Sequence, residues 1–122
     1  MSIERSTTFN MIFSGPWLEK QVMIMLNLTK NNNIVKISIS ETTGKIYSNS
    51  NEIIQSVSEL PEEYRPMKSV EIPLQILYKK DIIGMLEITE KGKMFIYAGL
   101  KKENFSEKIG EIGIYNTTIY YK

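Results

Sequence analysis

The sequence contains no cysteine and no histidine, and Asp81 is its only aspartate. Without cysteine, neither a disulfide nor a thiolate metal site can form. Without histidine, the commonest general base and the commonest transition-metal ligand are both missing. A calcium loop needs clustered aspartates and asparagines, which a single aspartate does not supply. We therefore expect no metal, no other cofactor and no enzymatic activity.

Neither sign of charge dominates, and no apolar run is long. Lysine and arginine number 15 against 14 acidic residues, so the chain lacks the concentrated basic surface that nucleic-acid binding requires. The longest apolar stretches, such as Val22 to Leu26, are far shorter than the roughly 20 residues that cross a bilayer. The start, Met1 to Arg5, has no basic region followed by an apolar run, so we expect no secretory signal. These features predict no nucleic-acid partner and no membrane insertion.

Apolar and polar residues alternate through most of the chain, which is typical of half-buried strands. Over 21–29 the apolar face is Val22, Ile24, Leu26 and Leu28, and the alternation resumes over 35–39 after an asparagine turn. Pro73 cannot donate a ladder hydrogen bond, so its strand is expected to lie at an edge or to carry a bulge. Further strands are predicted at 45–48, 52–57, 70–78, 82–89, 94–98 and 109–121, of which 52–57 also fits one helical turn.

About eight short antiparallel strands with little helix predict an all-β protein, specifically a jelly-roll-like antiparallel β-sandwich. The whole chain, residues 1–122, has the length of a single domain that can bury its own core. Within it, residues 1–7 could form a flexible N-terminal arm.

Aromatic side chains are the candidate contacts with a ligand or another subunit, because ring faces hold sugars and proteins. Trp17 follows a Ser-Gly-Pro turn, and its ring either closes the end of the sandwich or is exposed for binding. Tyr115, Tyr120 and Tyr121 cannot all face the core, since neighbours on a strand point to opposite sides. The candidate contacts are Trp17, Tyr97, Tyr115, Tyr120 and Tyr121.

Two other patterns carry no expected function. Glu62 and Glu63 are adjacent in a loop, whereas a glycosidase needs two carboxyl groups that face each other across a sugar. Glycosylation sequons occur at Asn27, Asn104 and Asn116, and an asparagine-rich chain produces such sequons by chance.

The most distinctive segment is Glu59-Leu60-Pro61-Glu62-Glu63-Tyr64-Arg65-Pro66. Its two prolines fix two backbone angles and push the preceding residues toward extended geometry, so the loop is stiff before it packs. We expect Tyr64 to fill a pocket between the sheets and Arg65 to hydrogen-bond nearby carbonyls. The motif residues Leu60, Pro61, Tyr64, Arg65 and Pro66 are therefore expected to form a structural corner rather than a ligand contact.

This segment resembles the Leu-Pro-x-x-Tyr-Arg-Pro loop of bacteriophage tail and baseplate proteins, in β-sandwich domains related to receptor-binding heads. In those domains a strand, a tight turn and a second hairpin with a Lys-Gly or Asp-Gly turn follow, as do 70–78, 82–89 and Lys91-Gly92 here. The resemblance covers about residues 13–100. It implies a homotrimer of jelly-roll-like heads on a virion, made in the host cytoplasm, which contacts other virion proteins and recognises a host-surface saccharide or protein.

Other classes stay open at this point. The chain shows no heptad repeat or shaft, so a purely architectural capsid or decoration protein fits equally well. A cellular trimeric jelly roll similar to the tumour-necrosis-factor and complement globular-head families would need a secretory route. A small carbohydrate-active enzyme is disfavoured by the missing histidine and the lone aspartate.

Overall fold

The computed structural model describes residues 4–17, 20–47, 53–105 and 109–122. Within these residues every paired strand is antiparallel, so the predicted all-β antiparallel class is confirmed. The strands number ten rather than about eight. In this part of the chain no helix has the length and apolar character to cross a membrane. The elements are β1 (Glu4–Ser14), β2 (Gln21–Asn31), β3 (Ile34–Ile39), β4 (Thr42–Tyr47), β5 (Ile54–Ser56), the 3₁₀ helix η1 (Glu62–Tyr64), β6 (Val70–Tyr78), β7 (Lys80–Ile88), β8 (Met94–Tyr97), β9 (Ile109–Ile114) and β10 (Thr117–Tyr121).

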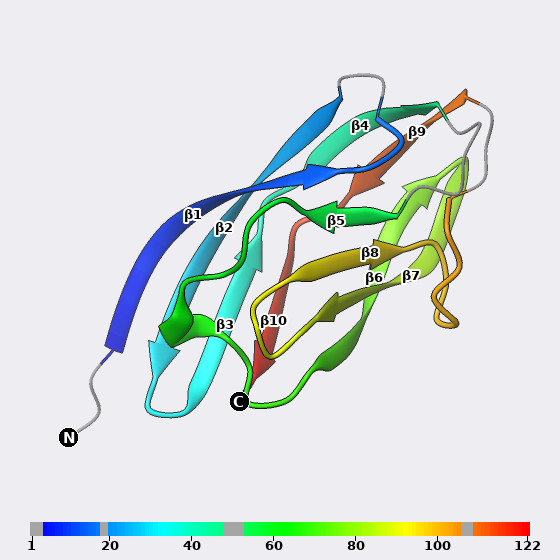
Figure 1. Cartoon of the computed structure of the whole chain (residues 1–122). Coiled ribbons are helices and arrows are strands. Elements are labelled where there is room, and N and C mark those ends of the chain that lie inside the picture. Colours follow the sequence, from blue (N-terminus) through cyan, green and yellow to red (C-terminus); the bar gives the residue numbers. More distant parts are fainter. Residues whose placement is uncertain (1–3, 18–19, 48–52, 106–108) are drawn as a thin grey trace.

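The strands form one sheet in the order β10-β3-β2-β1-β5-β8-β7-β6-β9-β4, and this sheet curls into a half-barrel (Figure 1). We call β10, β3, β2 and β1 the first layer, and β8, β7, β6, β9 and β4 the second layer; the short β5 joins them. Apolar side chains from both layers, including Leu26 from the first and Leu74 from the second, line one small internal void. The core therefore lies between the two layers.

The strand connections differ in part from those of a jelly roll. Strands β6 to β9 form a Greek key, because β9 returns to lie beside β6 and gives the order β9-β6-β7-β8. Strands β1 to β3 instead form a meander. Since a jelly roll contains two Greek keys, the sandwich-like architecture is present with a different topology in its first layer.

A bent ribbon carries the chain from one layer to the other. Ile39 on β3 opposes Thr117 on β10, and Thr42 on β4 opposes Ile114 on β9. The register therefore continues unbroken across the bend, so β3–β4 and β10–β9 are two long strands that cross the corner together. The single strand predicted over 109–121 is divided in two at this bend.

Burial follows the predicted alternation closely in β2 and β3. Leu26 and Leu28 are buried, while Met25 and Asn27, the residues that precede them, are exposed, because successive side chains of a strand point to opposite faces. The strand of Pro73 is not an edge strand as a whole, because β6 lies between β7 and β9. Its first part nevertheless has one free side: Pro73 opposes Met85 on β7, whereas the pairing of β6 with β9 begins only at Ile76. The missing N–H of Pro73 therefore breaks no hydrogen bond to a neighbouring strand on the free side of β6.

Strand β1 is not among the predicted strands, and it corrects the expected arm. Its whole length pairs with β2, from Glu4 opposite Asn31 to Ser14 opposite Gln21. Residues 4–7 of the expected arm are therefore an ordered strand, and residues 1–3 lie outside the described residues. The alternation of Phe9, Met11 and Phe13 marks only the second half of β1, because the first half is exposed on both faces.

Candidate functional site

The Leu-Pro-x-x-Tyr-Arg-Pro loop is a packed corner of the sandwich. Leu60, Tyr64 and Pro66 are buried, and Tyr64 is only 1% exposed. The side chain of Arg65 turns back over the loop, and its Nε donates a hydrogen bond of 2.8 Å to the carbonyl oxygen of Leu60. The loop, with Pro61 at the start of η1, thus sets the path of the chain between β5 and β6 and keeps the ring of Tyr64 away from solvent.

The Lys-Gly turn between β7 and β8 packs against this loop. Gly92 has a φ of +87°, a left-handed conformation that glycine adopts without steric cost. Its carbonyl accepts a 2.9 Å hydrogen bond from the backbone N–H of Leu60. A Cβ on Gly92 would lie 2.8 Å from that same nitrogen. The loop and the turn are therefore one packed unit, which gives a physical reason for the two sequence motifs to occur together.

Trp17 closes the end of the sandwich. The sequence left open whether its ring closes this end or is exposed for binding, and the structure shows the first of these. Its ring is only 7% exposed, and its backbone forms an isolated bridge with Ile46 of β4. A Cβ on Gly44 would lie 2.6 Å from the indole ring, so the ring rests against the bare backbone of β4. The buried indole N–H has no hydrogen-bond partner among the described residues. Trp17 therefore does not present a ring face to a ligand.

Tyr97 and Tyr121 are also only 7% exposed. Contrary to the expectation that they are candidate contacts, their rings are therefore not available on the surface of the monomer. The hydroxyl of Tyr121 donates a 2.6 Å hydrogen bond to the carbonyl oxygen of Tyr64, and burial raises the Tyr121 pKa. The hydroxyl of Tyr97 donates to Glu87 Oε1 at 3.2 Å. Burial, followed by the Glu87 carboxylate, raises the pKa of Tyr97. Both tyrosines therefore stabilise the fold.

The two remaining candidates differ in their surroundings. Tyr115 is half-buried, and its hydroxyl donates a 2.6 Å hydrogen bond to Asp81. That hydrogen bond is the main cause that raises the pKa of Tyr115. Tyr120 is 64% exposed and lies on β10 opposite Lys36 of β3. Of the five candidate contacts, Tyr120 alone presents most of its ring to solvent.

An ion cluster lies on the outer side of the second layer. Glu71 and Glu87 oppose each other on β6 and β7, and the ammonium of Lys102 lies 3.3 Å from Glu71 and 3.1 Å from Glu87. Hydrogen bonds to these two carboxylates raise the pKa of Lys102. The lysine neutralises the like-charge pair and ties the segment after β8 to β6 and β7.

The acidic residues of the motif loop do not face each other across a cleft. Glu63 forms a 2.9 Å ion pair with Arg5 of β1 on the surface, and Glu62 is exposed. Over the ranges that the structure describes, no group of three or more acidic side chains could hold a metal ion.

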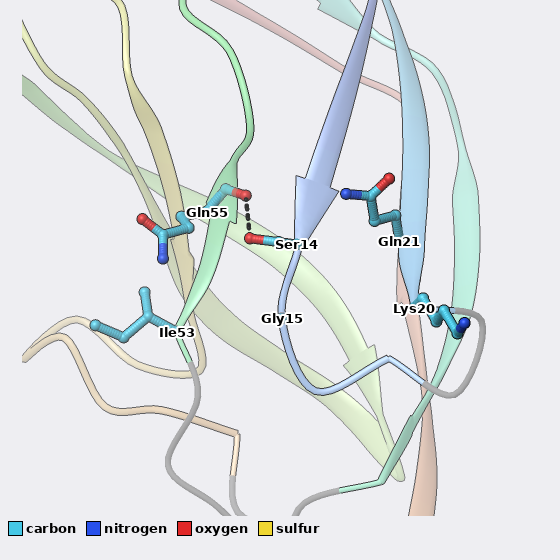
Figure 2. Close-up of a pocket in the computed structure, with 6 residues that line it drawn as sticks. All are labelled: Ser14, Gly15, Lys20, Gln21, Ile53 and Gln55. Atoms are coloured by element: carbon cyan, nitrogen blue, oxygen red, sulfur yellow. Dashed lines mark hydrogen bonds between the residues drawn. The ribbon is translucent and has the colours of Figure 1, made fainter.

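One open pocket of about 460 Å³ lies where β1 ends and β2 begins. Figure 2 shows Gln55 and Ile53 on one side of the segment Ser14–Gly15, with Gln21 and Lys20 on the other. The hydroxyl of Ser14 donates to the backbone carbonyl of Gln55. We call this hollow the end pocket.

A second hollow, of about 550 Å³, lies on the outer face of the first layer. Its wall comprises residues of β2, β3 and β10 and of the bend between the layers, and all of them except the buried Ile39 carry a hydroxyl or an amide. We call it the side groove. The lining residues are Asn27, Ser38, Ile39, Ser40, Asn116, Thr117 and Thr118.

The two hollows differ in how firmly their polar groups are held. No described residue hydrogen-bonds the side-chain amides of Gln21 or Gln55 in the end pocket. Fixing such a long side chain on a ligand costs about 1.5 kcal/mol of rotamer entropy. In the side groove, short side chains such as Asn116 are already held by hydrogen bonds within the protein. The side groove is therefore the better preorganised of the two.

Sequence reasoning missed the residues of the side groove. A signal was present, because the outward positions of 27, 38 and 118 carry asparagine, serine and threonine instead of charged residues. Only the pairing of β3 with β10, far apart in the chain, brings Ser38 opposite Thr118.

No protein-family model matches the chain, and no curated protein matches it at a significant level of similarity.

Proposed function

We propose that the protein is a virion structural head of the receptor-binding type, found on a phage tail, baseplate or fibre tip. In this proposal it assembles as a homotrimer and recognises a saccharide or protein on the host surface. The observation that carries the proposal is the loop from Leu60 to Pro66. The loop resembles that of phage head domains, and in this chain it forms the structural corner that its sequence predicts, with Tyr64 buried and Arg65 bonded to Leu60.

Saccharide recognition is supported by the chemistry of the first layer. Hydroxyl and amide side chains line the side groove, and such groups pair with sugar hydroxyls. A shallow site of this kind binds weakly, and three copies in one head would raise the effective affinity through avidity.

A glycan array in excess chelator tests this function. We expect binding that survives chelation, with no cleaved sugar detected by mass spectrometry after incubation. Binding abolished by the chelator, or release of a shortened sugar, would contradict it. No binding to any glycan would favour an architectural capsid or decoration protein. The virion assignment has its own test, because flanking tail, baseplate or capsid genes would support it and a cellular operon would not.

A further inference from the structure

The outer face of the first layer carries a row of uncharged polar side chains. The register places Thr8, Asn27, Ser38 and Thr118 opposite one another in turn, across β1, β2, β3 and β10. The hydroxyl of Thr8 donates to Asn27 Oδ1 at 3.0 Å, and the hydroxyls of Ser38 and Thr118 lie 3.4 Å apart. The row is therefore a continuous strip of hydroxyl and amide groups.

The side groove lies over the β3–β10 end of this strip and holds no charged side chain in its lining. Its volume of about 550 Å³ falls within the range of small-molecule sites, about 300–1,000 Å³. By contrast, the corresponding face of the second layer carries the charges of Glu71, Glu87 and Lys102. The absence of charge is thus a property of the groove and not of every outer strand face.

Asn116 shows which groups the groove offers. The backbone N–H of Glu41 donates to Asn116 Oδ1 at 2.6 Å. Because a backbone N–H can only donate, this bond identifies the side-chain oxygen and leaves the NH₂ group of Asn116 as a free donor. At Asn27 the side-chain oxygen accepts from the hydroxyl of Thr8, so the NH₂ group of Asn27 is the second donor. Two oriented amide donors therefore lie among hydroxyls that can both donate and accept.

These donors and acceptors match the hydroxyls of a neutral sugar. A phosphate or a sialic acid would require lysine or arginine in the wall, and the lining holds neither, although Lys36 lies opposite Tyr120 just beyond it. An apolar ligand would leave the amide donors unpaired. Tyr120 follows Thr118 on the outward side of β10 and is largely exposed, so its ring can stack on the apolar face of a pyranose.

We propose that the side groove is a binding site for a neutral oligosaccharide. Asn27, Asn116, Ser38 and Thr118 bind its hydroxyls, and Tyr120 stacks on one ring at the end of the groove. This assignment rests on the proposed function, because it takes a host-surface saccharide as the ligand. It adds that the saccharide binds on the outer face of the first layer.

The test uses the full chain on a printed array of neutral and sialylated oligosaccharides, followed by titration with the neutral glycan that gives the strongest signal. Asn27→Asp and Asn116→Asp keep the oxygen that accepts from Thr8 or Glu41 and remove the NH₂ donor. We expect each variant, and Tyr120→Ala, to bind at least tenfold more weakly. Gln75→Glu is the charge-matched control, because Gln75 is exposed on β6 in the second layer, and its affinity should not change.

Each remaining outcome overturns a defined part of the assignment. If the wild type binds a glycan and the three groove variants bind it equally well, the side groove is not the site, while saccharide recognition stands. If instead Gln21→Ala with Gln55→Ala abolishes binding, the site is the end pocket. If the wild type binds only sialylated glycans, the neutral ligand class is wrong. If it binds no glycan, both this assignment and the saccharide part of the proposed function fail. Unchanged circular dichroism and thermal midpoints show that the variants are folded.

Discussion

At the scale of single residues, Tyr64, Tyr120 and Tyr121 show that a tyrosine ring can either hold the fold together or face solvent. Tyr64 and Tyr121 are buried and joined by a hydrogen bond, whereas Tyr120 on the same strand as Tyr121 faces solvent. The difference follows from the alternation of a strand, which sends neighbouring side chains to opposite faces.

Replacing Tyr64 by alanine should lower the free energy of unfolding by about 3 kcal/mol, because a large buried ring is lost and a cavity remains. Urea denaturation followed by circular dichroism measures this change. Tyr64→Phe is the matched control and should remain within about 0.5 kcal/mol of the wild type, since no described residue hydrogen-bonds the Tyr64 hydroxyl. An alanine variant as stable as the wild type would show that the ring is not in the core.

The Tyr121 phenol should make the fold sensitive to alkaline pH. Burial raises its pKa above 10.0, the value of the unfolded chain, so the unfolded chain releases the proton first. The stability that Tyr121 contributes is full below pH 10 and falls as the pH rises from 10 toward the folded-state pKa. We expect the urea midpoint to fall less between about pH 9 and pH 11 in Tyr121→Phe than in the wild type.

At neutral pH the same Tyr121→Phe variant should be about 1 kcal/mol less stable, because the carbonyl of Tyr64 loses its donor. Tyr120→Phe is the control, since that ring is exposed, and its pH profile should follow the wild type. Identical alkaline profiles for Tyr121→Phe and the wild type would contradict the pH prediction. The raised pKa values of Tyr64, Tyr97 and Tyr115 contribute equally in all three proteins.

At the scale of secondary-structure elements, the bend between β3 and β4 and the bend between β9 and β10 hold the two layers together. The 2.6 Å hydrogen bond from Glu41 N to Asn116 ties the two bends at the corner. Further along, β4 lies against the ring of Trp17, where Gly44 leaves the space that the indole occupies. Glycine is therefore needed at position 44 of β4, because the indole ring occupies the space of a side chain.

Gly44→Ala should destabilise the protein by about 2 kcal/mol, because the new Cβ overpacks the contact with Trp17. The tryptophan fluorescence of the folded protein should also shift, since the ring must move. Thr43→Ala changes the neighbouring exposed position and should have little effect on either measurement. Stability and fluorescence unchanged in Gly44→Ala would mean that the indole does not rest on β4.

At the scale of the whole molecule, the C-terminal segment leaves less apolar surface uncovered than its candidate contacts suggest. There Tyr121 is buried together with Ile119, and Tyr120 is exposed. Exposed apolar side chains instead lie together on β1 and β2, where Ile12 opposes Met23 and Met25 is the next outward residue. The homotrimer therefore remains a prediction with a different candidate contact.

Sedimentation equilibrium at micromolar concentration should give three times the chain mass of 14.1 kDa. Met23→Lys should shift the protein toward the monomer by burying an unpaired charge in the contact. Ile83→Lys is the control, because Ile83 on the second layer has the same 56% exposure as Met23, and it should leave the trimer intact. A wild-type monomer would remove the trimeric head from the proposed function.

Four features could be predicted from the sequence: the all-β class, the buried faces of β2 and β3, the unpaired side of the strand at Pro73 and the stiff corner from Leu60 to Pro66. Each of these depends on residues that are close in the chain, where alternation and proline geometry act directly.

The tertiary structure alone decided the strand order, the burial of Trp17 and the side groove. These features depend on pairings between distant segments: β10 beside β3 brings Thr118 to Ser38, and β4 brings Gly44 to Trp17. Local patterns predict hairpins between consecutive strands, but they carry no information on which distant strands lie side by side. The register across those pairs is set by packing of the whole core, because a slip of one residue would turn every buried side chain outward.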